Sequence, residues 1–184
     1  MKKFIETLSN IWKIEELKSR ILVTLSLLLV YRFGAQIVLP GIDTTQLAQL
    51  TSNTDIGILN AFTGGAFANA SVFALGIMPY ISASIVVQLM GIAIPYLQKL
   101  QKEGESGRKT INQITRWLTI GICVVQAPAY LYSLGALGVP DSAFVLGKGI
   151  DFIIPSVIIL VTGTVFAMWL GEKITDKGIG NGIS

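Results

Sequence analysis

The sequence predicts an all-α membrane protein, a polytopic bundle of transmembrane helices, and three observations support this. Hydrophobic residues make up 52% of the 184 residues, and the mean hydropathy is +0.65. Charged residues make up 14%, against about 25% in an ordinary soluble domain. Four apolar segments each have about the 20 residues that a hydrocarbon core of about 30 Å requires. Because backbone groups in lipid need partners within the chain, we expect these segments to be helices.

Residues 1–20 precede the first apolar segment and have the pattern of a cytoplasmic amphipathic helix. Lys and Glu fill most positions of one face, and the other carries Phe4, Leu8, Ile11, Trp12 and Leu17. Such a helix either lies on the inner leaflet or docks on the protein itself. The apolar run begins too late for a cleavable signal peptide, and no small-residue cleavage site follows it.

The four expected spans are residues 21–39, 72–97, 117–137 and 150–170. Proline or glycine marks an end of each, as at Pro40, Pro95, Pro140 and Pro155. Between them lie an extracytoplasmic segment (40–71), a cytoplasmic loop (98–116) and an extracytoplasmic loop (138–149). The tail 171–184 is cytoplasmic and ends where a fifth span would begin. The single cysteine, Cys123, lies in the third span, and we expect it to be a small core residue.

The orientation follows from the lysines and arginines. All but Arg32 and Lys148 lie in residues 1–20, in the loop 98–116 or in the tail 171–184. The positive-inside rule therefore places the N-terminus, this loop and the tail in the cytoplasm, and the alternation agrees with four crossings. Arg32 lies in the outer half of the first span, where it is either an interfacial anchor or part of a functional pathway.

Two stretches are unlike simple lipid-facing helices. Residues 72–89 (VFALGIMPYISASIVVQL) contain small, hydroxyl and amide side chains, which suit close helix packing or the lining of a path through the membrane. Residues 56–62 are apolar but too short to span, and Gly64 and Gly65 follow them. This short run is either an extracytoplasmic cap packed on the bundle or a mobile element inserted into a funnel.

Other classes of membrane protein find little support in the sequence. A secondary transporter, the alternative that we keep open, would use acidic groups near the midplane, but the aspartates outside the cytoplasmic parts lie near or beyond the outer interface. An intramembrane enzyme needs a histidine, a metal motif or a buried pair of acids, and the chain has no histidine. We therefore expect no enzyme activity, no metal site and no cofactor.

Several long runs together resemble the SecY family, the central subunits of protein-conducting channels, in its bacterial branch. The runs are VFALGIMPYISASIVVQL (72–89), KEGESGRK (102–109), LVTGTVFAMWL (160–170), MWLGEKITDKGIGNGIS (168–184) and YRFGAQIVLPGID (31–43). They follow one another in the family's order over nearly the whole chain. The chain stops at Ser184, whereas SecY-type channels continue through a second half. The resemblance therefore implies the N-terminal half of such a channel.

The resemblance also implies roles for particular residues. A ring of aliphatic side chains at the waist of the channel would include Ile77, Ile81 and Ile183. A plug that blocks the outer funnel would include Ile56, Leu59, Asn60, Phe62, Gly64 and Gly65. Ser82 and Gln126 match positions of a lateral gate toward lipid, and both are equally suited to ordinary hydrogen bonds between helices. Lys102, Arg108 and Lys109 lie on the face that would receive a cytoplasmic partner.

The resemblance further implies the function and the partners. The expected function is that of the pore-forming subunit of the Sec translocon, which passes unfolded secretory polypeptides across the membrane and releases transmembrane segments sideways into lipid. The expected partners are SecE and SecG, the SecA motor and the ribosome, signal sequences and nascent polypeptides, membrane lipid and the remaining half of the channel. The expected location is the cell inner membrane, with a multi-pass topology.

Overall fold

The computed structural model describes residues 14–43, 65, 66, 69–136, 144, 147 and 149–183. These residues form five helices in the order α2 (Glu15–Gly34), α5 (Met78–Ala93), α6 (Pro95–Lys102), α7 (Glu105–Ala136) and α8 (Ile150–Lys177). In the described part of the chain, strand-like pairing is limited to two isolated bridges, Val38 with Ser71 and Ile42 with Phe144. The predicted all-α fold is confirmed.

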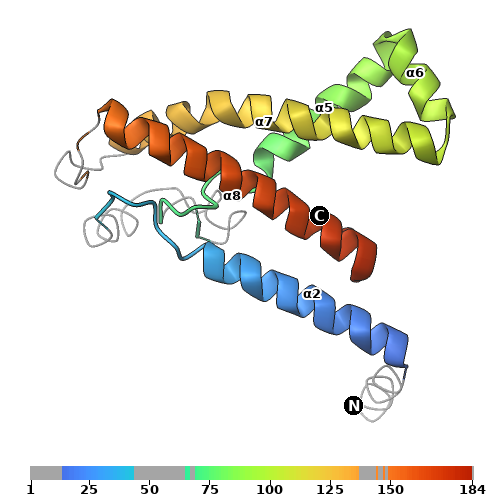
Figure 1. Cartoon of the computed structure of the whole chain (residues 1–184), viewed down its shortest axis with the longest axis horizontal. Helices are drawn as coiled ribbons and strands as arrows, with labels where there is room; N and C mark the ends of the chain where they lie inside the picture. The colour runs from blue at the N-terminus through green and yellow to red at the C-terminus, as the bar shows by residue number, and fades with distance from the viewer. Residues whose placement is uncertain are drawn as a thin grey trace.

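The helices form an open bundle whose centre is the pair α7 and α8 (Figure 1). These two helices run side by side in opposite directions, α5 and α6 pack on α7, and α2 packs on α8. The starts of α2 and α7 and the end of α8 lie toward the same side of the molecule. This is the side that the lysine and arginine pattern predicts to be cytoplasmic.

The second expected span differs from the helix that the structure contains. Residues 71–77 form turns, with Gly76 at a φ of +54°, and α5 begins at Met78 with Pro79 in its first turn. The helix ends at Ala93 because Ile94 precedes a proline and is extended, with φ −102° and ψ +115°. Pro95 then opens α6, which leaves α5 at an angle of 102°. The expected 72–97 helix is thus shortened at both ends.

The first helix is displaced toward the N-terminus relative to the expected span 21–39. It begins at Glu15, inside the expected amphipathic helix, and ends at Gly34. Residues 37–39 then pair with the chain around Ser71: the N–H of Leu39 donates to the carbonyl of Ala70, and the N–H of Val72 donates to that of Ile37, both at 2.9 Å. The chain after the C-terminal end of α2 is therefore tied to the segment that leads into α5.

The last two helices extend past the expected spans on the side that the lysine and arginine pattern predicts to be cytoplasmic. Helix α7 starts at Glu105, within the expected loop 98–116, and α8 continues to Lys177, within the expected tail. The turns of α7 and α8 that lie beyond the expected spans are rich in charged residues, as is usual where a helix extends out of the hydrocarbon core into water. Gly104, at a φ of +71°, makes the sharp turn between α6 and α7.

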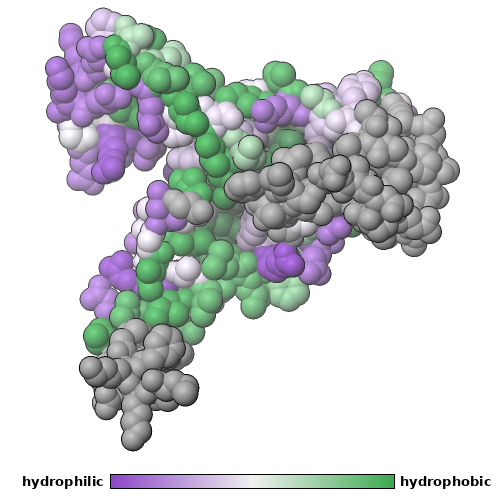
Figure 2. Space-filling view, turned by 180° about the vertical axis from the view of Figure 1, so that it is seen from behind, coloured by the Kyte–Doolittle hydropathy of each residue, from purple (hydrophilic) through white to green (hydrophobic). Residues whose placement is uncertain are grey.

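The largest buried core lies at the end of the bundle opposite the charged ends. It combines the last turns of α7, the first half of α8 and the paired segments near residues 38–42 and 70–74, and its members are Leu39, Ile42, Ala70, Ala74, Ala127, Tyr130, Leu131, Leu134, Phe144, Phe152 and Leu160. The other end is looser. Figure 2 shows a hollow there, between the arm with α6 and the start of α7 and the arm with α2 and the end of α8.

Membrane crossing is supported helix by helix. Within the described residues, α7 (over Glu105–Leu134) and α8 are long and apolar enough to cross, and α5 with α6 gives a third span if the bent pair acts as one. Helix α2 carries charges at Lys18 and Arg20 near its start and at Arg32 near its end, and it is not counted among these. The expected number of four crossings stays a prediction.

Candidate functional site: an isoleucine-lined groove

An apolar groove of about 490 Å³ lies between α2, the start of α5 and the second half of α8. The three residues expected in the pore ring, Ile77, Ile81 and Ile183, all line it. They come from two parts of the chain that are about a hundred residues apart. We call this feature the isoleucine groove; its other lining residues are Leu27, Leu28, Tyr31, Gly76, Met78, Ala167, Leu170, Gly171, Ile174 and Gly182.

The start of α5 places two of these isoleucines on one face. Ile77 is the residue before the helix, and the N–H of Ile81 donates to its carbonyl at 3.0 Å. Residues at i and i+4 of a helix lie on the same face, so the two side chains are neighbours in the groove wall. The buried stripe of α5 (Pro79, Ala83, Val87 and Gly91) lies on a different face. Helix α5 therefore turns small residues toward the bundle and isoleucines toward the groove.

Ile183 reaches the groove because the chain folds back after α8. Gly182 packs so closely on α8 that a Cβ at this position would overlap the carbonyl oxygen of Gly171. The N–H of Ile183 donates to Oδ1 of Asn181 at 3.1 Å. The backbone of the groove is therefore built partly from glycine, and its side-chain lining is aliphatic except for Tyr31 and the thioether of Met78.

Aromatic side chains connect the groove to the turn before α5. Tyr31 stacks on Phe73 with ring centroids 5.3 Å apart, and Phe73 stacks on Phe166 of α8 at 6.0 Å. Phe166 in turn stacks on Trp169, and the ammonium group of Lys173 lies 5.8 Å from the centre of that ring. This column fixes the segment of residues 71–77 between α2 and α8, and that segment ends at Ile77.

Most of the expected plug lies outside the described residues. Ile56, Leu59, Asn60, Phe62 and Gly64 are among the residues that the structure does not describe. Gly65 is described, has a φ of +90°, and its carbonyl accepts a hydrogen bond from the N–H of Asn69 at 3.1 Å. It adjoins Ala66, which is buried with Ala35 and Phe73. The chain at the expected hinge is thus packed at the outer end of α2.

The two expected lateral-gate residues lie on helices that pack together. Ser82 is half-buried on α5 beside Ala83, and Gln126 is exposed on α7 beside Ala127. In the described structure no hydrogen bond joins their side chains. Neither residue lines the isoleucine groove.

The three residues expected to contact a cytoplasmic partner cluster around the turn between α6 and α7. Lys102 ends α6, and Arg108 and Lys109 lie in the first two turns of α7; all three are exposed. Arg108 also lines a polar cavity of about 630 Å³ between α5, α6 and α7, with Gln88, Gln101 and Asn112 among its neighbours.

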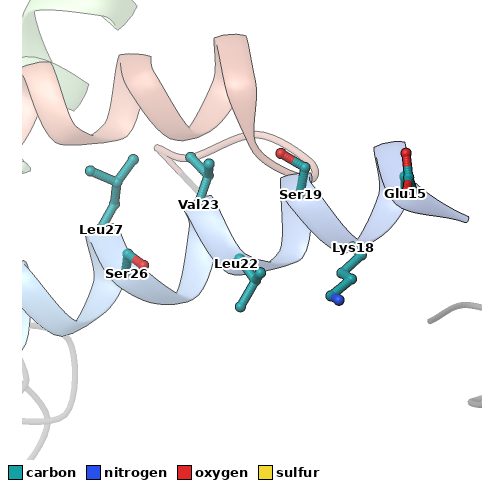
Figure 3. A pocket seen from close by; sticks show the side chains of 7 residues that line it. All are labelled: Glu15, Lys18, Ser19, Leu22, Val23, Ser26 and Leu27. Carbon is teal, nitrogen blue, oxygen red and sulfur yellow. The ribbon is translucent and has the colours of Figure 1, made fainter. Parts of the chain in front are cut away.

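A further depression runs along the start of α2 and is lined by Glu15, Lys18, Ser19, Leu22, Val23, Ser26 and Leu27 (Figure 3). Figure 3 shows that Glu15, Ser19, Val23 and Leu27 point toward the end of α8. None of the expected site residues lines this depression. It marks the passage of α2 from a polar start to an apolar middle.

Sequence reasoning missed an ion pair between α7 and α8. Nε of Arg116 donates to Oε1 of Glu172 at 3.0 Å, and a terminal nitrogen of the same guanidinium donates to Oε2. Arg116 directly precedes the expected span 117–137, and Glu172 follows the expected span 150–170. The predicted topology therefore places these opposite charges at the same membrane face, and this could have indicated the pair. The walls of the groove on α2 and α8 were also missed, because aliphatic residues facing a groove look the same in sequence as those facing lipid.

The fold and the groove define a polytopic helical membrane protein with an aliphatic groove inside its bundle. The family model described as SecY matches residues 71–184. The chain therefore belongs to the SecY family.

Curated relatives agree with this membership. Each of three is named "Protein translocase subunit SecY", and the alignments cover 92% of this chain. The Haemophilus influenzae protein is 50% identical over 174 residues, which are 38% of its length. The Escherichia coli K12 protein is 48% identical over 177 residues, 39% of its length. A Buchnera aphidicola protein is also 48% identical over 177 residues, 48% of its length. The chain thus spans two fifths to about half of the length of these relatives.

Proposed function

We propose that this chain supplies the N-terminal part of the pore-forming subunit of a protein-conducting channel. In this function, unfolded secretory polypeptides pass across the membrane and transmembrane segments leave sideways into lipid. The observation that carries the proposal is the meeting of Ile77, Ile81 and Ile183 in one groove. The relatives named as translocase subunits support it.

The chemistry of the groove suits a neck that passes any sequence but holds back ions. Branched aliphatic side chains form a narrow apolar constriction, which excludes water and ions by dewetting. They make no hydrogen bonds that a passing peptide would have to break.

The remaining sites complete the proposed mechanism. The segment with Ile56, Leu59, Asn60, Phe62, Gly64 and Gly65 acts as a plug on the outer side. Helices α5 and α7, with Ser82 and Gln126, form one side of a lateral gate whose other side belongs to the remaining half of the channel, and opening of this gate exposes the pore to lipid. An apolar signal sequence favours the open state because it binds there and not in the closed state. Lys102, Arg108 and Lys109 contact a cytoplasmic partner through their charge.

The proposed setting follows from the same function. A translocase subunit works within a complex, and the proposed partners are SecE, SecG, the SecA motor or the ribosome, and the rest of the channel. The chain is placed in the cell inner membrane with its N-terminus in the cytoplasm. No enzymatic step is assigned to it.

Cross-linking tests the proposal directly. We would build a chimaera in which residues 1–184 replace the matching part of the Escherichia coli relative, and place a photoreactive amino acid at position 77 or 183. A secretory polypeptide arrested during transport should form adducts at both positions. Position 158 of α8, where Ile158 is exposed and away from the groove, is the matched control and should react with lipid. Adducts with lipid alone at 77 and 183 would refute the proposed pore.

A further inference from the structure

Residues 178–183 bring Ile183 into the isoleucine groove, and two threonine hydroxyls hold their backbone. Near the start of this segment, the N–H of Ile179 donates to Oγ1 of Thr24 in α2 at 3.0 Å. Near its end, the N–H of Gly182 donates to Oγ1 of Thr175 in α8 at 2.9 Å. The segment is thus attached to a different helix at each end.

Each threonine hydroxyl can accept a hydrogen bond from the segment, because it donates its own proton to a backbone carbonyl of its helix. Oγ1 of Thr24 donates to the carbonyl of Arg20, and Oγ1 of Thr175 donates to that of Gly171, both at 2.9 Å. A threonine hydroxyl has one proton and two lone pairs, so these bonds leave acceptor capacity for the segment. They also fix the rotamer of each side chain, as is usual for a hydroxyl bonded to the carbonyl one turn earlier.

The contact with α2 is close, and the segment would be weakly ordered without it. A Cβ at Gly178 would clash with Oγ1 of Thr24 and with the carbonyl of Ile174. The segment contains three glycines in its six residues, Gly178, Gly180 and Gly182. Glycine loses more conformational freedom on ordering than any other residue, so such a segment needs external anchors to keep one conformation. Figure 3 shows the chain beyond α8 passing close to α2.

We infer that Thr24 is a positioning residue for the neck. Its hydroxyl attaches the segment of residues 178–183 to α2 and so holds Ile183 opposite Ile77 and Ile81. The inference rests on the proposed function in that it takes the isoleucine groove to be the neck of the channel. It assigns to α2 a task beyond crossing the membrane, since one hydroxyl of this helix orients a residue that follows α8.

The test compares Thr24→Val, which keeps the shape but removes the hydroxyl, with Thr24→Ser, which keeps the hydroxyl. Both are made in the chimaera, in a Cys123→Ala background. The first measurement is amide hydrogen exchange at Ile179. The second is the yield of cross-linking, by a short dithiol-reactive reagent, between cysteines placed at 77 and 183. Thr162→Val is the matched control, because Thr162 donates to the carbonyl of Ile158 in the same way but holds no segment.

Thr24→Val should raise exchange at Ile179 and lower the cross-linking yield, each by about two- to ten-fold, as expected for loss of one hydrogen bond. Thr24→Ser and Thr162→Val should behave like the parent. Unchanged exchange and yield in Thr24→Val would overturn the inference, as would a Thr24→Ser variant that is equally impaired.

Resting ion leakage, measured in the Thr24 and Thr162 variants that keep Ile77 and Ile183, separates the inference from the proposed function. Neither exchange nor cross-linking depends on transport. Raised exchange and lowered cross-linking together with raised leakage support the positioning role and the neck. Raised exchange and lowered cross-linking with unchanged leakage support the positioning role of Thr24 but overturn the neck.

Discussion

The side chain of Ile81 shows how little of the site chemistry lies in any single residue. It is 40% exposed in this chain, so by itself it resembles any lipid-facing isoleucine. Its significance comes from its neighbours, because Ile77 precedes it by one turn and Ile183 lies in the same groove. An aliphatic constriction blocks ions by dewetting, and a polar group within it can hydrogen-bond water and so weaken this barrier.

Polar replacement of Ile81 should therefore open the resting neck to ions. In the chimaera, Ile81→Asn is expected to raise resting ion conductance in planar bilayers several-fold. Ile85→Asn is the matched control: Ile85 is one turn further along α5 and 52% exposed, but it does not line the groove. Equal conductance in the two variants would contradict the ring assignment of Ile81.

Gly163 is a residue whose small size the packing requires. It lies buried in α8, and a Cβ there would overlap the backbone carbonyl of Val72, in the segment that leads to Ile77. Backbone cannot move aside as a flexible side chain can, so overpacking of this kind costs about 1–3 kcal/mol. Gly163→Ala should lower the thermal unfolding midpoint of the detergent-solubilised chimaera.

The control for this change is Gly121→Ala in α7. Gly121 is exposed, and a Cβ there has nothing within 4 Å. Because alanine favours helix over glycine, this variant should leave the midpoint unchanged or slightly raised. A midpoint that falls equally in both variants would show that the contact with Val72 has no special importance.

At the scale of elements, the ion pair of Arg116 and Glu172 joins the N-terminal half of α7 to the C-terminal half of α8. The side chains are 48% and 21% exposed, so the pair contributes modestly, about 1 kcal/mol or less. Arg116→Glu places two carboxylates together and should lower the unfolding midpoint of the chimaera. The charge swap Arg116→Glu with Glu172→Arg should recover most of the loss.

Salt dependence provides the internal control for this pair. The penalty of the single variant should shrink at 1 M salt, where the screening length is about 3 Å. A swap variant as unstable as the single variant, with no effect of salt, would contradict an electrostatic role for the pair.

How much of each element the sequence predicted depends on the kind of signal at its ends. Apolar length predicted the existence and order of the helices, but their bounds moved where backbone geometry decided. Gly76 and Pro79 delay the start of α5 to Met78, and Pro95 ends it early, so the expected 72–97 helix is shorter and bent. Proline positions were visible in the sequence, but the direction of the bend was not.

The site was predictable in a different way. Ile77 and Ile81 share a face by helix periodicity alone, whereas the position of Ile183 required the resemblance to a known family. The walls contributed by Leu27, Leu28 and Leu170 could not be predicted, because apolar runs do not distinguish a lipid-facing stripe from a groove-facing one. Thr24 was equally hidden, since its partner Ile179 is 155 residues away.

At the scale of the whole molecule, packing differs between the two ends of the helix bundle. The predicted extracytoplasmic end contains the large core around Leu39, Ala127 and Phe152. The predicted cytoplasmic end has spread arms with a hollow between them (Figure 2). A vestibule that admits a polypeptide from the cytoplasm, as the proposed function requires, would have this shape.

The orientation that this picture needs is testable with the chain's own residues. The single native cysteine, Cys123, is buried and can be replaced by alanine, which leaves a background without thiols. A cysteine at position 109, in the second turn of α7, should react with a membrane-impermeant maleimide in inside-out vesicles and be protected in right-side-out vesicles. The positive-inside rule predicts this result, because residues 98–116 are rich in lysine and arginine. A cysteine at the exposed Gly149, where a Cβ has open space, should show the opposite pattern. Detergent permeabilisation, which should make both sites reactive, controls for burial of either thiol. Labelling of both positions from the same side would mean that α7 does not cross the membrane, which would contradict the predicted topology.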